Sequence, residues 1–165
     1  MMNARQIVFL DIDGVLHRGQ SYVTREGIVS SAPGNIILFE YASVLEDLLC
    51  PYPRAEIVLS SDWAYRFGAD YTQGMLPSQS LRDRVAGATY QGCLFDEQFW
   101  PMLSRGEQVL DYVRRHTPLT WIAIDDRKDG FENYRERLVH CQSDCGLGDR
   151  AVVELLRRRL DRFFS

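Results

Sequence analysis

Short apolar runs alternate with helix-like segments along the chain, and this alternation limits the folds it can adopt. Strand-like runs recur at residues 6–10, 56–60 and 119–124, with a weaker run at 138–142. Strands separated by helices are typical of parallel sheets, because each crossover between parallel strands is long enough to form a helix. The pattern predicts an α/β domain, a three-layer α/β/α sandwich around a mostly parallel sheet.

Three helices are predicted from their start and stop signals. The first begins at an Asn35 cap and stops before Pro51, and the last begins at an Asp149 cap. Between them, Ser104 and Glu107 have the spacing of a capping box. Apolar residues recur at helical spacing in each stretch, so we expect one face of each helix to lie in the core.

Composition and charge exclude several classes of protein. The chain has 165 residues, 45% hydrophobic and 25% charged, which is usual for one soluble globular domain, here expected over residues 1–165. The net charge of −4 argues against a broad basic surface for nucleic acid, although a local basic groove is compatible with it. The start of the chain resembles neither a signal peptide nor a membrane span. Four cysteines without a C-x-x-C pair predict free thiols and a cytoplasmic location.

The first apolar run ends in a pair of aspartates. Asp11 follows Leu10 directly and Asp13 lies two residues after Asp11, so a strand's side-chain period of two places both carboxylates on the same side. Like charges this close need a shared proton or a cation between them. Gly14 allows the sharp turn that would bring backbone amides near an anion. The alternative interpretation is a hairpin turn with two solvated aspartates.

The next two apolar runs also end in polar residues. Ser60 and Ser61 follow one run, and Asp125 and Asp126 end the other. In open α/β sheets ligands bind beyond the carboxyl ends of the strands, so we expect these side chains to meet Asp11 there. A site built from several aspartates, with positions left for water and phosphate, suits Mg²⁺.

The order of these motifs resembles that of the haloacid dehalogenase (HAD) superfamily. D-x-D-G-V-L comes first, then an apolar strand ending in Ser, a basic residue at a helix start, and an apolar strand ending in Asp-Asp. The chain is most similar to the small, minimally capped phosphatase-type domains, including the group associated with bacterial RNA-repair proteins. The resemblance implies a Rossmann-like fold with little or no cap domain, and a Mg²⁺-dependent phosphatase acting on a phosphomonoester.

Roles for the acidic residues follow from the resemblance. It implies that Asp11 attacks phosphorus to form an aspartyl phosphate. Asp13 would protonate the leaving oxygen and then deprotonate the hydrolytic water. Asp11, the Asp13 backbone carbonyl and Asp125 would hold Mg²⁺, with Asp126 nearby.

The phosphate-binding residues are less sharply defined. Ser60 would donate its hydroxyl to a phosphoryl oxygen, and Ser61 is the neighbouring candidate because a one-residue slip at the strand end exchanges them. Arg105, at a helix start, stands where the family usually has lysine, and its planar guanidinium does not reproduce a lysine point charge. Arg127 or Lys128 is an alternative source of that charge.

Residues around the motifs offer further contacts. His17 could approach the substrate or have no role, and Trp63, Tyr65 and Arg66 could grip a leaving group or simply pack.

The substrate class follows from the lack of a large cap. A small lid leaves an open site that would admit a nucleotide, a nucleic-acid end or a phosphoprotein. The alternatives to a phosphatase are a non-catalytic HAD-fold module that binds phosphate or a partner, and a phosphotransferase. The sequence leaves the oligomeric state open.

Overall fold

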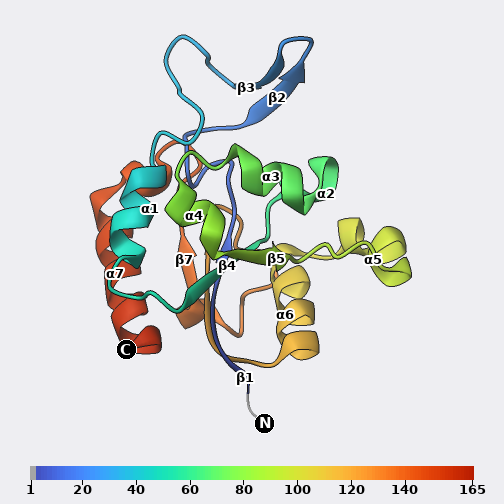
Figure 1. Ribbon diagram of the computed structural model, residues 1–165, viewed down its shortest axis with the longest axis vertical. Helices are drawn as coiled ribbons and strands as arrows, with labels where there is room; N and C mark the ends of the chain where they lie inside the picture. Colours follow the sequence, from blue (N-terminus) through green and yellow to red (C-terminus); the bar gives the residue numbers. More distant parts are fainter. Residues whose placement is uncertain (1–2) are drawn as a thin grey trace.

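The computed structural model describes residues 3–165. Within this range the central sheet has five strands in the order β5-β4-β1-β6-β7, and each pair of neighbours is parallel (Figure 1). The strands are β1 (Asn3–Leu10), β4 (Ala55–Leu59), β5 (Val85–Ala88), β6 (Pro118–Asp125) and β7 (Leu138–His140). The predicted parallel α/β sheet is therefore confirmed. β5 was not predicted, because its sequence Val-Ala-Gly-Ala is short and has low β propensity.

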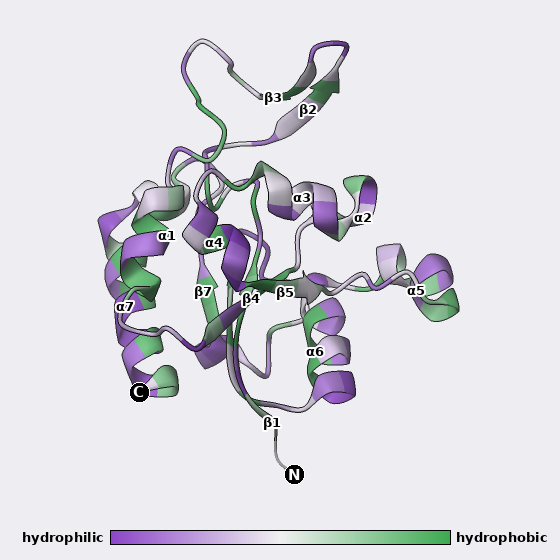
Figure 2. Cartoon of the chain, viewed as in Figure 1, coloured by the Kyte–Doolittle hydropathy of each residue, from purple (hydrophilic) through white to green (hydrophobic). Residues whose placement is uncertain are grey.

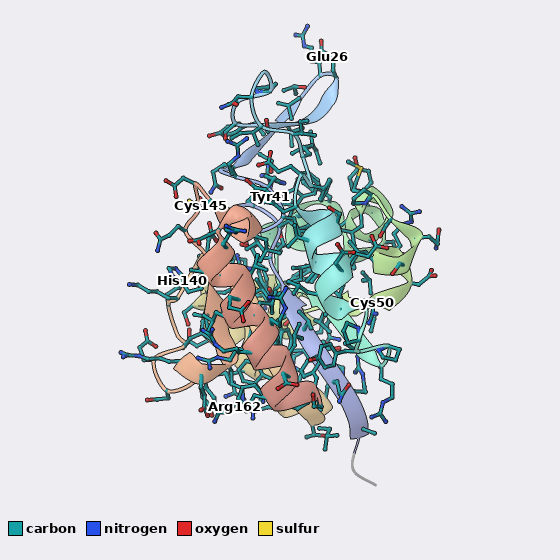
Figure 3. The ribbon with its side chains drawn as sticks, turned by 90° about the vertical axis from the view of Figure 1, so that its left-hand side faces the viewer. Glu26, Tyr41, Cys50, His140, Cys145 and Arg162 are labelled. Carbon is teal, nitrogen blue, oxygen red and sulfur yellow. The ribbon has the colours of Figure 1, made fainter. Side chains whose placement is uncertain are left out.

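Helices cover both faces of the sheet and complete three layers. The α-helices of the described residues are α1 (Ala42–Leu49), α2 (Asp62–Phe67), α3 (Ala69–Met75), α4 (Gln79–Arg84), α5 (Leu94–Phe99), α6 (Arg105–His116) and α7 (Arg150–Phe164). In Figure 1, α1 and α7 lie on one side of the strands and α6 on the other. Figure 3 looks onto the first side, where α1 and α7 run next to each other with polar side chains outward.

The core follows from the alternation of side chains along β1. Val8 and Leu10 belong to the hydrophobic cluster that includes residues of α1 and α7, whereas Ile7 and Phe9 pack with Val109 of α6. The central strands are therefore buried on both faces, as expected for a parallel sheet. In Figure 2 these strands are mainly hydrophobic, whereas α1, α6 and α7 carry both hydrophobic and hydrophilic residues.

The first helix begins later than predicted. Its cap is Tyr41, and Asn35 lies in the turns that precede it. Phe39 adopts a left-handed backbone conformation with φ of 61°, which a right-handed helix cannot continue through. The helix ends before Pro51, as predicted.

The other two helix starts are confirmed. Ser104 Oγ accepts a hydrogen bond from Glu107 N at 3.2 Å, and the Glu107 carboxylate accepts one from Ser104 N at 2.7 Å, which completes the capping box of α6. Asp149 Oδ1 accepts from Ala151 N at 2.9 Å and caps α7. α6 therefore starts at Arg105 and presents that residue to the carboxyl edge of the sheet.

The segments between the motifs are small. Residues 17–34 contain an antiparallel hairpin, β2 (Ser21–Thr24) and β3 (Gly27–Ser30), which rises above the sheet in Figure 1. Residues 68–103 form short helices, β5 and connecting turns. Across residues 3–165 neither segment builds a large cap domain, so the expectation of a minimally capped α/β fold is confirmed.

Candidate active site

Three strand ends meet at one level of the sheet. Leu10 of β1 pairs with Leu59 of β4 and with Ile124 of β6. The residues that follow are therefore adjacent: Asp11 N donates to Ile124 O at 3.1 Å, and Ser60 N donates to Leu10 O at 3.0 Å. The register thus brings the predicted polar residues of separate strands together.

A cavity of about 110 Å³ opens at this edge of the sheet. Six of the residues predicted from the sequence line it: Asp11, Asp13, Ser61, Arg105, Asp126 and Arg127. A water occupies about 30 Å³ in the liquid, so the cavity has the size of a small anion. Ser60 and Asp125 are fully buried beneath it, and Lys128 lies elsewhere, in a separate cavity with Phe131.

Three carboxylates form a compact acidic cluster. Asp11, Asp125 and Asp126 each offer an oxygen, and these oxygens lie within 4.8 Å of one another. Burial, and then the neighbouring Asp125, raise the pKa of Asp11 well above its ordinary value. Burial also raises the pKa of Asp125 to about 6, although Arg105 opposes the rise.

This cluster fits a hard divalent cation. Asp125 Oδ2 is buried, and Arg105 Nε lies 3.3 Å away, yet no residue in the range 3–165 forms a hydrogen bond with that oxygen. An all-oxygen donor set with an unsatisfied buried carboxylate is the environment that Mg²⁺ favours. The Asp13 side chain is not part of the cluster, and the metal ligand expected from this residue is its backbone carbonyl.

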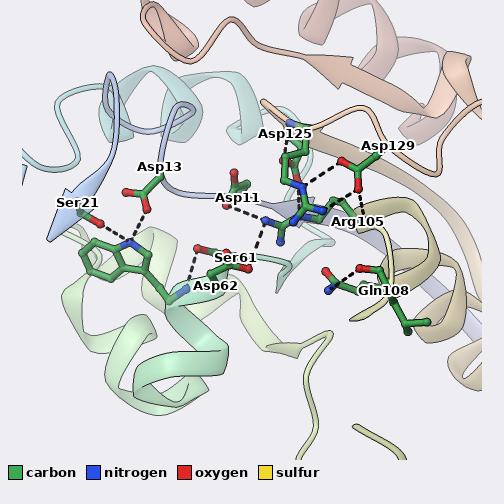
Figure 4. A network of polar contacts seen from close by, with 12 residues as sticks. Asp11, Asp13, Ser21, Ser61, Asp62, Arg105, Gln108, Asp125 and Asp129 are labelled. Carbon is green, nitrogen blue, oxygen red and sulfur yellow. Dashed lines mark hydrogen bonds and ion pairs between the residues drawn. The ribbon is translucent and has the colours of Figure 1, made fainter. Parts of the chain in front are cut away.

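Arg105 provides positive charge at the wall of the cavity. Its side chain is 3% exposed, with Nη2 at 3.9 Å from Asp11 Oδ1 and 3.6 Å from Asp62 Oδ1. Burial alone would lower the pKa of Arg105, but Asp11 and Asp125 raise it above its ordinary value. Nε and Nη1 are buried without hydrogen-bond partners in the described part of the chain. The guanidinium can therefore bind a further anion beside the carboxylates (Figure 4).

A comparison with family models agrees with this arrangement. Residues 7–152 match the model described as the HAD domain in Swiss Army Knife RNA repair proteins. The chain belongs to this HAD family. This family assignment suggests a phosphatase-type hydrolase. Comparisons with curated proteins and with solved structures found no match.

Arg127, the other basic residue at the cavity of the HAD domain, is paired with a carboxylate. Arg127 lines the cavity, but its Nη2 and Nε bind the two Asp129 oxygens at 2.7 and 3.0 Å, and this pairing lowers the pKa of Asp129 to about 2. Asp129 also accepts from Arg105 N at 3.0 Å and so helps to cap α6. The sequence pattern did not indicate Asp129. The only available signal was that the first backbone amides of a helix need hydrogen-bond acceptors from outside the helix.

The close approach of Asp126 leaves no room for a side chain at Gly14. Its φ is 73°, a conformation that other residues rarely adopt. A Cβ atom at this position would overlap the Asp126 carboxylate. The predicted turn after β1 is therefore present, and it makes room for a member of the acidic cluster.

Asp13 also lines the cavity. Its Oδ1 is 2.9 Å from His17 Nε2, and its Oδ2 accepts from Trp63 Nε1 at 3.3 Å. The sequence did not indicate either contact, because both partners are separated from Asp13 by turns or by a whole crossover. Tyr65, by contrast, stacks on Trp100 with ring centroids 5.0 Å apart.

No helix within residues 3–165 is long and apolar enough to cross a membrane.

Proposed function

We propose that this HAD domain is a Mg²⁺-dependent phosphatase that hydrolyses a phosphomonoester through an aspartyl-phosphate intermediate. The observation that carries the proposal is the cluster of Asp11, Asp125 and Asp126, whose oxygens lie within 4.8 Å, beside the buried Arg105. Mg²⁺ held by these carboxylates would neutralise the repulsion between Asp11 and a phosphate and stabilise the charge that develops during transfer. The Asp13 backbone carbonyl is proposed as a further ligand.

The reaction proceeds in two steps on two carboxylates. An oxygen of Asp11 attacks phosphorus, the bond from phosphorus to the leaving oxygen breaks, and Asp13 transfers its proton to that oxygen. Asp13 then takes a proton from the water that attacks the phosphoryl group, and Asp11 is released as a carboxylate. Both residues line the same cavity, as this two-step reaction requires.

Ser61 is proposed as the serine that contacts the phosphoryl group. It lines the cavity, and its Oγ accepts a hydrogen bond from Trp63 N at 3.1 Å. A hydroxyl that accepts one bond still has its O–H to donate. Ser60 Oγ is buried without a partner in residues 3–165 and does not line the cavity. Arg105 supplies the positive charge of the third motif in place of lysine, since Arg127 is paired with Asp129.

The substrate is proposed to be a nucleotide or a phosphorylated nucleic-acid end. The cavity of about 110 Å³ accepts a phosphoryl group while the rest of the substrate stays outside. The absence of a large cap in the described chain allows a bulky leaving group to approach. The family description, RNA repair proteins, supports nucleic acid as the source of that phosphate.

A phosphate-release assay with and without Mg²⁺ tests the proposal. The substrates are nucleotides, oligonucleotides with a 3′- or 5′-phosphate, and a phosphopeptide. We expect Mg²⁺-dependent release from the nucleic-acid substrates, and none from the Asp11→Asn variant, whose folding is checked by thermal melting. Inactivity across the panel in folded, Mg²⁺-supplied protein would indicate a non-catalytic binding module. Phosphoryl transfer to added nucleosides would indicate a phosphotransferase.

A further inference from the structure

A buried hydrogen-bond network surrounds the carboxylate of Asp13. One oxygen faces His17 Nε2 at 2.9 Å, and the other accepts from Trp63 Nε1 at 3.3 Å. His17 is fully buried and Trp63 is 2% exposed, whereas the Asp13 side chain keeps 21% of its surface exposed toward the cavity. The donors are thus held inside the protein while the acid itself stays accessible.

The tautomer of His17 follows from its other contact. Phe39 N donates to His17 Nδ1 at 3.3 Å, and a backbone amide can only donate. Nδ1 therefore carries a lone pair, and the ring hydrogen is on Nε2, where it points to Asp13 Oδ1. The left-handed Phe39 that delays the start of α1 places its amide at this ring.

Trp63 is fixed on several sides. Its backbone nitrogen donates to Ser61 Oγ, the cap of α2, and its ring packs edge-on against Phe39 and Phe67 with centroid distances of 5.5 and 5.7 Å. The indole nitrogen also donates to Ser21 Oγ at 3.0 Å (Figure 4). Ser21 begins β2, so the base of the hairpin is linked to the same nitrogen as Asp13.

We infer that His17 and Trp63 are positioning residues that orient the Asp13 carboxylate for proton transfer. Each carboxylate oxygen faces a different donor, and the indole hydrogen is shared between Asp13 Oδ2 and Ser21 Oγ, so a rotation of the carboxyl group would lengthen both contacts at once. A proton must be delivered to the leaving oxygen within hydrogen-bond reach, and a small misplacement of the acid greatly slows the reaction. The inference rests on the proposed function, in which Asp13 is the acid.

The test compares leaving groups in the Trp63→Phe variant, which keeps a ring but removes the donor. An alcohol leaving group, as in a nucleoside phosphate, needs a proton from Asp13, whereas p-nitrophenolate departs without one. We expect kcat/KM to fall by about tenfold or more for the nucleoside phosphate and by about twofold or less for p-nitrophenyl phosphate. Because kcat/KM covers only the steps up to formation of the aspartyl phosphate, this comparison excludes the later hydrolysis. Equal losses on both substrates, or none, would overturn the inference.

Three further variants separate positioning from packing. Trp100→Phe makes the same change at a tryptophan that is also 2% exposed, but whose Nε1 has no hydrogen-bond partner in residues 3–165. We expect no leaving-group-dependent change from it. His17→Gln keeps a side-chain N–H donor and should preserve more of the nucleoside phosphate activity than His17→Leu does. Equal activities of His17→Gln and His17→Leu would contradict the role of His17.

An NMR measurement tests the contact between Trp63 and Asp13 without an activity assay. The Nε1–H resonance of Trp63 should shift in Asp13→Asn more than the corresponding resonances of Trp100 and Trp121. An unchanged Trp63 resonance would refute the network. If the wild type hydrolyses neither ester, the proposed function fails, and this spectrum still reports whether Asp13 is bound by the indole.

Discussion

Removal of metal should make the stability of this protein depend on pH through the buried Asp125. Its pKa lies at about 6 in the folded chain, against an ordinary value of 3.8, mainly because of burial. When the pKa of an acid is higher in the folded state than in the unfolded state, ionisation of that acid lowers the free energy of unfolding. The loss of stability therefore begins above pH 3.8 and is complete above about pH 6.

The size of the effect follows from the same two values. A pKa raised from 3.8 to about 6 corresponds to a loss of at most about 3 kcal/mol in the free energy of unfolding. For a domain of this length that is a decrease of about 6 to 12 °C in Tm. Under the proposed function Mg²⁺ would bind the ionised carboxylates and offset their burial, so its stabilising effect should increase with pH.

Thermal melting with EDTA or with Mg²⁺ measures this directly. We expect EDTA to lower Tm strongly at about pH 7.5 and weakly at about pH 5. In Asp125→Asn the side chain cannot ionise, and the neighbour that raises the pKa of Asp11 is lost, so the pH dependence in EDTA should be smaller and the Mg²⁺ response absent. If wild type and variant show the same pH dependence in EDTA, or if Mg²⁺ has no effect on wild-type Tm, the reasoning is wrong.

Substitutions at three positions test other parts of the structure. Ser104→Ala removes one half of the capping box of α6 and should lower the free energy of unfolding by about 1 kcal/mol in urea denaturation; an unchanged midpoint would show that Asp129 caps the helix alone. Arg105→Lys keeps the charge and should retain part of the phosphatase activity, whereas Arg105→Ala should lower kcat/KM by about 100-fold, and equal activities would remove Arg105 from the site. Gly14→Ala introduces a Cβ where Asp126 lies and should weaken Mg²⁺ binding by calorimetry, so wild-type affinity would argue against the acidic cluster as the metal site.

The choice between Ser60 and Ser61 shows where sequence reasoning stops. Both follow the same strand, and adjacent residues of a strand point to opposite faces, so the sequence could not tell which hydroxyl meets a ligand. The structure places Ser61 at the cavity and Ser60 beneath it. The same holds for Arg127, whose charge is used by Asp129, a pairing that depends on how the turn after β6 folds back.

The sequence by itself determined the parallel α/β sheet and the level at which the acidic residues meet, because strand periodicity and parallel register are local rules that carry Asp11 and Asp125 to one edge. Only the tertiary structure decided what surrounds Asp13. Its partners come from the turn after β1 and from α2, and their approach depends on the left-handed Phe39 and on the packing of three aromatic rings. Contacts of that kind arise from the packing of distant segments, which no local pattern encodes.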